Sequence, residues 1–549
     1  MKNSGKNLLG EKESLRNFSR SLPMVLLRAR ETVMERFRPN LRAHNLTDQQ
    51  WRILRALFDQ GKKDLGELSN MCCILKPSIT RIIRSMEERS LLKRSTDNYD
   101  QRRTIVSITT IGRDLISVVG PNSEAIYQDI ASALGAWILF GPASAATWGG
   151  IGAVIGYALG TAFPLFLLIY LGKKFRISYP KGKTLIEVIR IRFGSKLFKL
   201  ILFLSIFYMT IFLIAEVTAI SILINYISGT DLWITALIVI ISSLAYTLYG
   251  GLRASIFTDN IQFIILVLLL LIGFSYIILF NSNDFNFEFI KTNKSNLLST
   301  NYVPNFTAGL TFFIAVAATN LFHQGNWQRV YAAKNNDVLK KSLILSFVII
   351  IPIVFLMGFS GLVAVSQNSN IIPDLAFFSL LLKEQSIILS VIIILLAISL
   401  TVSSIDTLIN AISSLVIVDG NKIIKFKGNY LNLSKQIVLF LSLITFFIAS
   451  KGLSILYLFL LADLFCCAAV FTVFYSFYSK SLNEKNSYIS IIIGLVAGLM
   501  LFPSPDFSKS LLVGIVFPAN FFPTFVSQSL LFCSFIAATF VPIVTWKLK

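Results

Sequence analysis

The sequence predicts a mainly α-helical protein with two unlike parts: a winged helix-turn-helix domain over residues 1–130 and a polytopic membrane domain over residues 131–549. Three observations lead to this prediction. Charged and polar residues fill the first part, whereas the second part is apolar almost to its end. Apolar runs such as 197–213 and 263–280 have the length that crosses roughly 30 Å of hydrocarbon. Helical segments and one basic hairpin follow one another before residue 110.

Composition excludes several classes of protein. The 549 residues are 54% hydrophobic and only 14% charged, which indicates an integral membrane protein. Two histidines, His44 and His323, are too few for a histidine-rich metal site or a His-dependent catalytic triad. Residues 181–184 resemble the end of a phosphate loop, but Ile177 occupies the place of its first glycine. We therefore expect no enzyme, no nucleotide-driven pump, no metal other than a coupling ion and no organic cofactor.

Four helices are predicted before residue 90. Apolar residues at helical spacing predict the first over 22–38. Thr47 as the N-cap and Gln50 three residues later form a capping box that opens the second. Residues 64–70 form a short third helix, and 76–78 open the fourth with a proline in the first turn.

The fourth helix and the hairpin after it carry the basic residues of this part. Apolar side chains from Ile79 to Met86 occupy one face of the helix, and the opposite face is polar and basic. Two alternating runs, 91–94 and 104–109, predict the hairpin. A solvated face would explain a basic helix alone, but a basic helix beside a basic wing favours DNA binding. The candidate DNA-binding residues are Lys76, Ser78, Thr80, Arg81, Arg84, Arg102 and Arg103.

Several motifs of this part resemble the MarR family, in particular repressors of homoprotocatechuate degradation operons. The resemblance covers about residues 14–130 and implies a dimeric regulator that binds an aromatic acid, with Asp100 and Arg102 forming the wing tip. In the family the last helix holds the dimer together. Here that helix begins near Ile111 and is cut short near Ile130, so we expect a truncated domain with weakened dimerisation. The matching motifs lie at 28–31, 37–39, 44–53, 73–78 and 100–103.

The second part divides into about twelve apolar spans. The net charge of +21 includes roughly +8 in residues 1–130, and the rest lies between these spans. Alternate loops are rich in lysine and arginine, which predicts a multi-pass protein of the inner (plasma) membrane with residue 130 and the C-terminus in the cytoplasm. The predicted spans are 131–149, 150–172, 197–227, 232–250, 255–281, 305–323, 341–366, 386–417, 434–450, 453–478, 488–503 and 525–546.

Four separated motifs of this part resemble the sodium:solute symporter family. They lie at 184–194, 246–262, 324–334 and 400–407. The resemblance covers residue 131 to the end and implies a LeuT-type inverted repeat, Na⁺-coupled symport of a small organic solute, and a site at mid-membrane where helices break. The family's first span is missing from this sequence.

The resemblance also implies the site residues. The broken helix would break at Gly141-Pro142. Na⁺ would be bound by the carbonyl groups of Ala131, Leu134 and Leu400 and the hydroxyl groups of Ser403 and Ser404. On the residues alone, Ser403 and Ser404 would serve close helix packing. The candidate residues of the substrate cavity are Trp137, Phe140, Gly141, Phe312, Asn320 and Gln324.

Four carboxylates, Glu216, Asp259, Asp406 and Asp463, lie within or beside the predicted spans. A charge at that depth is costly, so such residues mark ion paths or buried hydrogen-bonded structure. Three functions remain open from the sequence: a Na⁺-coupled symporter with a cytoplasmic MarR-like domain, a membrane-tethered transcriptional regulator, and an in-frame fusion of a regulator and a symporter that performs neither role.

Overall fold

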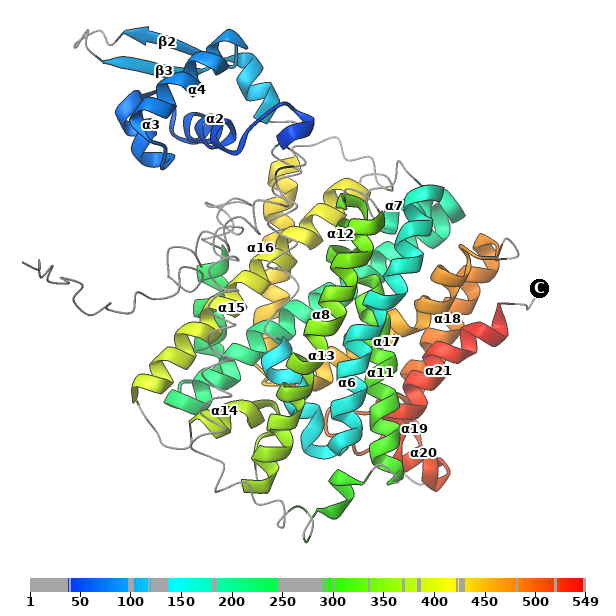
Figure 1. Cartoon of the computed structure of the whole chain (residues 1–549). Helices are drawn as coiled ribbons and strands as arrows, with labels where there is room; N and C mark the ends of the chain where they lie inside the picture. The colour runs from blue at the N-terminus through cyan, green and yellow to red at the C-terminus, as the bar shows by residue number, and fades with distance from the viewer. Residues whose placement is uncertain are drawn as a thin grey trace, which may run out of the picture. The chain divides into compact units, whose positions relative to one another are not determined.

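The computed structural model divides into two compact units, Met1–Tyr127 and Gln128–Lys549, and we describe each unit by itself (Figure 1). Predictions that fall on other residues, such as the first helix over most of 22–38, the wing tip and the motif at 246–262, lie outside the described residues. The residues described are 38, 41–96, 103–116, 119, 137–179, 185–244, 290, 292, 294–299, 302–333, 336–367, 371–382, 387–420, 423, 430–479, 482–517 and 521–546.

The first unit contains helices α2, α3 and α4 and a small antiparallel sheet, which confirms the predicted winged helix. The strand order is β1-β3-β2, and the β2–β3 pair runs from Leu92 opposite Ile108 to Thr96 opposite Thr104. The elements are α2 (Asp48–Gln60), β1 (Lys63–Asp64), α3 (Leu65–Met71), α4 (Lys76–Glu88), β2 (Leu92–Thr96) and β3 (Thr104–Ile108).

Local capping explains where the helices of this unit begin. The Thr47 hydroxyl accepts from the Gln50 amide at 3.2 Å, and the Gln50 side chain accepts from the Thr47 amide at 3.0 Å. This is the predicted capping box, and Asp64 with Glu67 repeats it at the start of α3. Each box satisfies backbone groups that have no partner inside a helix, so the sequence fixes both N-termini locally.

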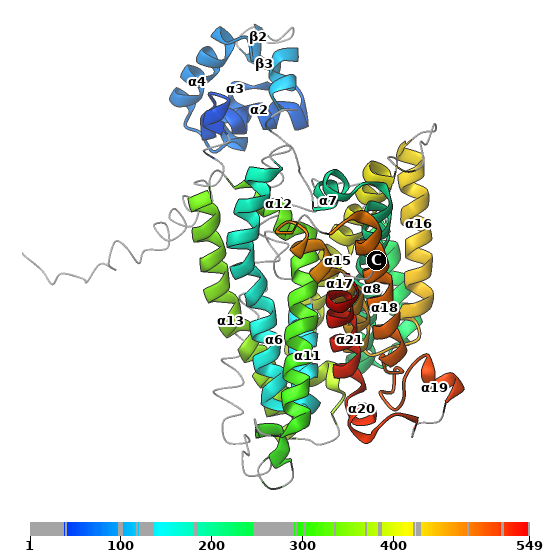
Figure 2. The same ribbon diagram turned by 90° about the vertical axis from the view of Figure 1, so that its right-hand side faces the viewer.

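The second unit is a bundle of long apolar helices (Figures 1 and 2). Its described helices of twenty residues or more lie close to the predicted spans. They are α6 (Trp137–Ser178), α8 (Ser195–Ser228), α11 (Val303–Phe322), α13 (Asn336–Gln367), α15 (Ile387–Ser414), α16 (Tyr430–Ala449) and α17 (Ile455–Tyr475). Shorter elements are α7 (Leu185–Phe193), η2 (Ser295–Leu298), α12 (Gln324–Ala332), η3 (Pro373–Leu375), α14 (Ala376–Leu381), η4 (Leu415–Asp419), α18 (Glu484–Leu501), α19 (Val513–Val516), α20 (Thr524–Gln528) and α21 (Leu530–Thr545).

Six of the described helices are long and apolar enough to cross a membrane, and three further apolar helices are shorter. The predicted boundary between the spans 131–149 and 150–172 is confirmed by a kink within α6, where Gly150 takes φ 56° and ψ −153°. Only glycine adopts such angles at low cost. The carbonyl of Leu297 and the amide of Asn305 lie against the same Gly150, so the kink is also a packing point.

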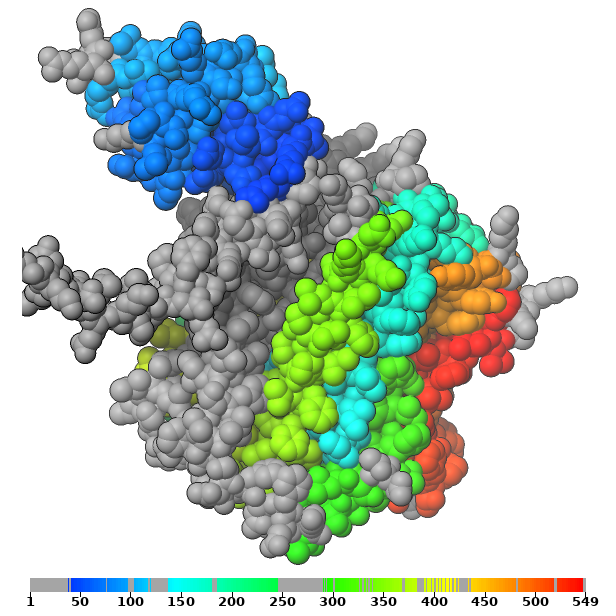
Figure 3. Space-filling view, viewed as in Figure 1, coloured from blue at the N-terminus to red at the C-terminus, as the bar shows by residue number. Residues whose placement is uncertain are grey.

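The outer surface of the second unit is apolar, as a lipid-facing surface requires. α13 illustrates this, because it lies along α6 on the face seen in Figure 3 and only 22% of its most apolar window is buried. Exposure of so continuous an apolar face to water would be unfavourable, so we infer that this face of α13 contacts lipid hydrocarbon. The exposed apolar side chains of α13 include Ile344, Leu345, Val348, Ile349, Phe355 and Leu356.

The predicted lysine- and arginine-rich loops meet at one end of the bundle. The Arg192 guanidinium of α7 donates to the carbonyls of Ser476 at 3.3 Å and Ser479 at 3.2 Å, after the end of α17. The ammonium of Lys174 lies 3.4 Å from the ring centre of Tyr478. Glu484, at the start of α18, accepts from the amides of the first turn of α8. These contacts join the ends of five helices, α6, α7, α8, α17 and α18, at one end of the bundle.

Candidate functional site

The helical path through α11 and α12 is interrupted at His323. The residue has φ −60° and ψ 118°, so the helix stops and restarts at Gln324. Side chains from α12 satisfy the carbonyls that the break leaves free. Asn326 donates its amide to the Asn320 carbonyl at 2.8 Å, and Trp327 donates its indole N–H to the Leu321 carbonyl at 2.7 Å. The break is therefore a built feature of the fold.

An aromatic stack lies beside this broken helix. Tyr157 of α6 stacks on Trp137 at a centroid distance of 6.1 Å and on Phe312 of α11 at 5.5 Å. Gly141 makes room for it, since a Cβ there would lie 2.5 Å from the Tyr157 hydroxyl. Three of the predicted cavity residues thus converge on Tyr157, which the sequence did not single out. A single tyrosine within an apolar run does not indicate a binding site in the sequence, because its role depends on the residues that it packs against.

The other predicted cavity residues lie apart from this stack. Phe140 packs against Phe378 of α14 at a centroid distance of 5.0 Å. Asn320 donates its side-chain amide to the Val316 carbonyl at 2.9 Å, within its own helix, and Gln324 opens α12. Both polar residues flank the break rather than the stack.

The predicted break at Gly141-Pro142 is wrong. Both residues lie inside the helical part of α6, and Gly150 is the residue with non-helical angles in that helix.

The predicted Na⁺ ligands are described only in part. Ala131 and Leu134 lie outside the described residues, whereas Leu400, Ser403 and Ser404 lie in the middle of α15. A buried hydroxyl in the same turns, that of Thr401, has no hydrogen-bond partner among the described residues. Such a buried hydroxyl oxygen is a ligand of the kind that a hard cation prefers.

A second candidate surface lies on the first unit. Ile79, Ile83 and Met86 bury one face of α4, and the opposite face is exposed, as predicted. Arg84 makes only an i,i+4 contact with Glu88 at 3.6 Å. The Lys76 side chain and Arg102 lie outside what the structure describes. The exposed predicted residues of α4 are Ser78, Thr80, Arg81 and Arg84.

Comparison with known proteins shows that the two units are similar to two different protein families. The sequence model of the "Sodium:solute symporter family" matches residues 112–494, which is more than half of the chain. The chain belongs to the sodium:solute symporter family. The model of the "MarR family" matches residues 46–104 and confirms the other predicted resemblance. We call the two units the MarR-like unit and the symporter unit.

The relatives of each unit are distinct proteins. The MarR-like unit is 41% identical over 110 residues to the "Homoprotocatechuate degradative operon repressor" of Escherichia coli, covering 20% of this chain and 74% of the repressor. The symporter unit is 27% identical over 352 residues to the "Spermidine transporter DUR31" of Candida albicans, covering 63% of this chain and 65% of the transporter. The chain thus spans just under two thirds of that transporter's length.

One solved structure supports the fold of the symporter unit. A Na⁺-coupled sialic acid symporter, in a substrate-bound outward-open state, is 19% identical, with a TM-score of 0.54, and the match covers 77% of this chain and 90% of that one. This likeness confirms the predicted LeuT-type architecture. The kink at Gly150 and the break at His323 are the irregular points of two helices of this fold.

The symporter unit buries carboxylates that the sequence could not assign. Asp463 of α17 accepts a hydrogen bond from the Thr319 hydroxyl of α11 at 2.6 Å. Asp374 of η3 accepts from Ser144 at 2.9 Å, from the Ile455 amide at 2.9 Å and from the Leu456 amide at 3.3 Å. The latter carboxylate caps the start of α17, where the helix dipole favours a negative charge.

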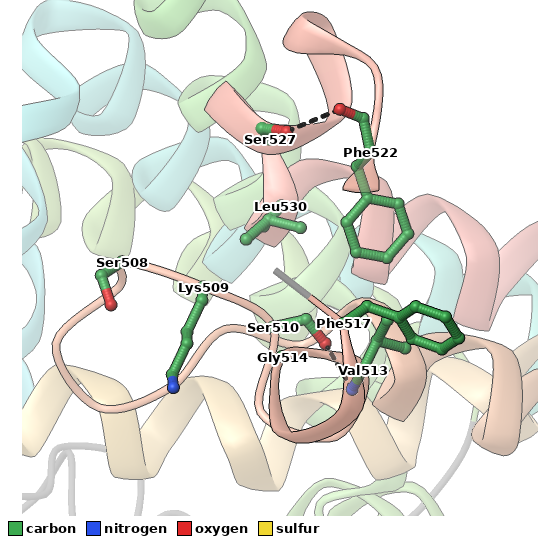
Figure 4. A pocket seen from close by; sticks show the side chains of 9 residues that line it. All are labelled: Ser508, Lys509, Ser510, Val513, Gly514, Phe517, Phe522, Ser527 and Leu530. Atoms are coloured by element: carbon green, nitrogen blue, oxygen red, sulfur yellow. Dashed lines mark hydrogen bonds between the residues drawn. The ribbon is translucent and has the colours of Figure 1, made fainter. Parts of the chain in front are cut away.

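A pocket described near the end of the chain lies away from these residues. It is formed by the loop region after α18 and by the starts of α19, α20 and α21 (Figure 4). Ser527 donates to the Phe522 carbonyl at 3.1 Å, and the Val513 amide donates to Ser510 at 3.2 Å. These contacts fold the loop upon itself, so we assign the pocket to loop packing rather than to the transported solute.

Arg103 holds the base of the wing in the MarR-like unit instead of projecting freely. Its guanidinium pairs with Asp64, which also caps α3. The hydrogen bond from Arg103 holds the pKa of the Asp64 carboxyl below its ordinary value. The predicted DNA contact is therefore joined to a structural role that sequence reasoning missed.

We expect the Arg103–Asp64 pair to stabilise the MarR-like unit only while Asp64 is ionised. The folded pKa lies below the unfolded one, so the stabilisation is complete above the ordinary aspartate range and is lost as the pH falls through the lowered pKa. Arg103→Ala should lower the unfolding free energy by less than about 1 kcal/mol at neutral pH, because the pair is partly exposed. Thermal unfolding of both proteins at pH 7 and pH 3 measures this. A difference that is as large at pH 3 contradicts the prediction.

Proposed function

We propose that the protein is a secondary active transporter that couples the uptake of a small organic solute to Na⁺ by alternating access. The observation that carries this proposal is the LeuT-type bundle of long apolar helices, in which α6 is kinked at Gly150 and α11 ends at His323. In transporters of this architecture, ions and polar solutes bind near the middle of the membrane, between the helices. Both families that match the chain consist of regulators and transporters rather than enzymes.

In this proposal helices α6 and α11 form one side of the solute site. The stack of Trp137, Tyr157 and Phe312 provides its apolar wall. Leu400, Ser403 and Ser404 of α15, together with Ala131 and Leu134, hold Na⁺. Phe140, Gly141, Asn320 and Gln324 shape the cavity or flank its break. Alternating access rocks the helices that carry the stack against α8 and α15.

We propose that the protein lies in a bacterial-type plasma membrane and that the end of the bundle with Arg192 and Lys174 faces the cytoplasm. The helix ends gathered there belong to the lysine- and arginine-rich loops. Positive residues are retained on the cytoplasmic side during insertion. Both the MarR-like unit and the C-terminus then lie in the cytoplasm, where the former can meet DNA.

Ser404→Ala is expected to raise the Na⁺ concentration needed for half-maximal uptake by about tenfold. Loss of one hydroxyl ligand to a cation costs on the order of 1–2 kcal/mol, and each 1.4 kcal/mol is a factor of ten. Uptake into proteoliposomes with an imposed Na⁺ gradient measures this, with a solute panel that includes spermidine and sialic acid because relatives carry these names. Ser228→Ala, at the end of α8, is the control. Absence of Na⁺-dependent uptake of every solute would refute the proposed function.

We also propose that the MarR-like unit binds DNA as a dimer, because the exposed face of α4 is basic. Arg81→Ala should weaken binding about tenfold if it contacts a base, and should reduce the salt dependence by about one ion if it contacts a phosphate. Fluorescence anisotropy over a salt series distinguishes these contacts. Gln60→Ala, at the exposed end of α2, is the control, and a variant of Arg81 with unchanged affinity at every salt concentration contradicts the proposal.

A further inference from the structure

The buried charged side chains described in the symporter unit all carry the same sign of charge. The buried charged side chains among the described residues of this unit are all acidic, namely Glu216, Asp374, Asp419 and Asp463. Asp374 is satisfied by Ser144 and by the start of α17, and Asp419 has an interaction of its own. Asp463 and Glu216 therefore remain as the two buried carboxylates that lack a cationic partner in the described part of the chain.

Asp463 is a buried carboxylate at the contact between α17 and α11. It is 5% exposed, and its described hydrogen bond comes from Thr319 of α11. The same helix α11 carries Phe312, whose ring stacks on Tyr157. A buried carboxylate without a cationic partner can bind an organic ammonium group through charge-assisted hydrogen bonds.

Glu216 lies on α8, which packs against α17, the helix that carries Asp463. It is 3% exposed, and its Oε2 atom has no hydrogen-bond partner among the described residues. α8 and α17 run antiparallel, because Phe207 packs on Phe465 at 4.4 Å and Phe212 on Phe459 at 4.9 Å. Glu216 follows Phe212 by one helical turn, and Asp463 follows Phe459 by one turn in the opposite direction. The two carboxylates are thus separated along the helices by roughly 11 Å, at about 1.5 Å per residue.

We propose that the transported solute is an elongated organic cation with two amino groups, one bound at Asp463 and the other at Glu216. This rests on the proposed transport function and names its substrate class. An extended chain of about nine single bonds covers the separation, at roughly 1.2 Å per bond. The rings of Phe212 and Phe459 lie between the two carboxylates and provide an apolar lining for the methylene groups.

Na⁺ is the other cation that a buried carboxylate attracts, but the surroundings of Asp463 do not suit it. Na⁺ prefers several hard oxygen ligands, and Thr319 is the described side chain that hydrogen-bonds Asp463. One helical turn further along α17 lie the thiols of Cys466 and Cys467, which are poor ligands for a hard cation. The hydroxyl groups of α15 provide the better Na⁺ surface.

Uptake of radiolabelled spermidine into proteoliposomes, driven by a Na⁺ gradient, tests this inference, because its terminal nitrogens are about nine bonds apart. Competition by 1,8-diaminooctane, 1,3-diaminopropane and hexylamine reports chain length and charge. We expect the long diamine to compete at least tenfold better than the short one. Asp463→Asn should reduce spermidine uptake at least tenfold, and Asp463→Glu should restore part of it. Glu216→Gln should weaken the long diamine while leaving competition by hexylamine unchanged.

Asp231→Asn, an exposed carboxylate of the same unit, should leave uptake unchanged, and the amount of each variant in the membrane shows that it folds. Na⁺-driven uptake of a neutral or anionic solute but not of amines would overturn the inference while leaving the proposed function intact. A shifted Na⁺ requirement in Asp463→Asn with unchanged competition by amines would make Asp463 an ion ligand and would also overturn it. Absence of all Na⁺-driven uptake refutes the proposed function itself.

Discussion

Replacement of Asp374 by alanine is expected to destabilise the symporter unit by about 3 kcal/mol and to abolish most of its transport. The carboxylate accepts hydrogen bonds from Ser144 of α6 and from the amides of Ile455 and Leu456. Removal leaves three buried donors without a partner, each at a cost of about 1–3 kcal/mol before water or relaxation offsets it. Thermal unfolding of the purified protein and Na⁺-driven uptake measure the two effects.

Asp374→Asn provides the graded comparison, because an amide oxygen still accepts from one or two of the three donors. We expect roughly half of the loss seen with alanine. Asp231→Asn, at an exposed helix start where asparagine caps as well as aspartate does, should change stability by less than about 0.5 kcal/mol. Equal stability of the Asp374→Ala protein and the unaltered protein would show that the three hydrogen bonds do not hold α6, η3 and α17 together.

Replacement of Gly156 by alanine is expected to prevent normal packing of α6 against α11. A Cβ at this position would lie 2.7 Å from the Cα and the carbonyl carbon of Gly309 and closer still to the carbonyl oxygen. The neighbour is backbone, so it cannot turn away as a side chain would, and the helices must separate. We expect a loss of about 3 kcal/mol or more, at the upper end of overpacking effects, together with loss of uptake.

Gly420→Ala is the matched control for this prediction, since the nearest atom to its added Cβ is 3.7 Å away. The yield of monodisperse protein in detergent and the unfolding temperature distinguish the two variants. If Gly156→Ala behaves as Gly420→Ala does, the close approach of α6 and α11 is not required for folding. If the Gly156→Ala protein is as stable as the unaltered protein but has lost uptake, the close packing of α6 against α11 is required for transport and not for folding.

The features that follow from local sequence were predictable. The Thr47–Gln50 box, the proline at the start of α4 and the buried stripe from Ile79 to Met86 all depend on neighbours within one or two turns. The positions of the long apolar helices follow from hydrophobicity in the same way.

The features that depend on contacts far apart in the chain were not predictable. Asp374 and Ser144 are separated by 230 residues, and nothing in either neighbourhood indicates that they meet. The break that the family resemblance implied at Gly141-Pro142 is absent, and the non-helical residue of α6 is Gly150, at the predicted boundary between two spans. Tyr157 gained significance only from its packing between Trp137 and Phe312, and Arg103 from its pair with Asp64.

The hydrogen bonds at its two ends hold α17 to different helices. Asp374 holds its first residues to α6 and η3, whereas Arg192 holds the segment after its last residues to α7. Under the proposed alternating access, α17 can tilt only after one of these two attachments opens, and the attachment that stays closed becomes its pivot.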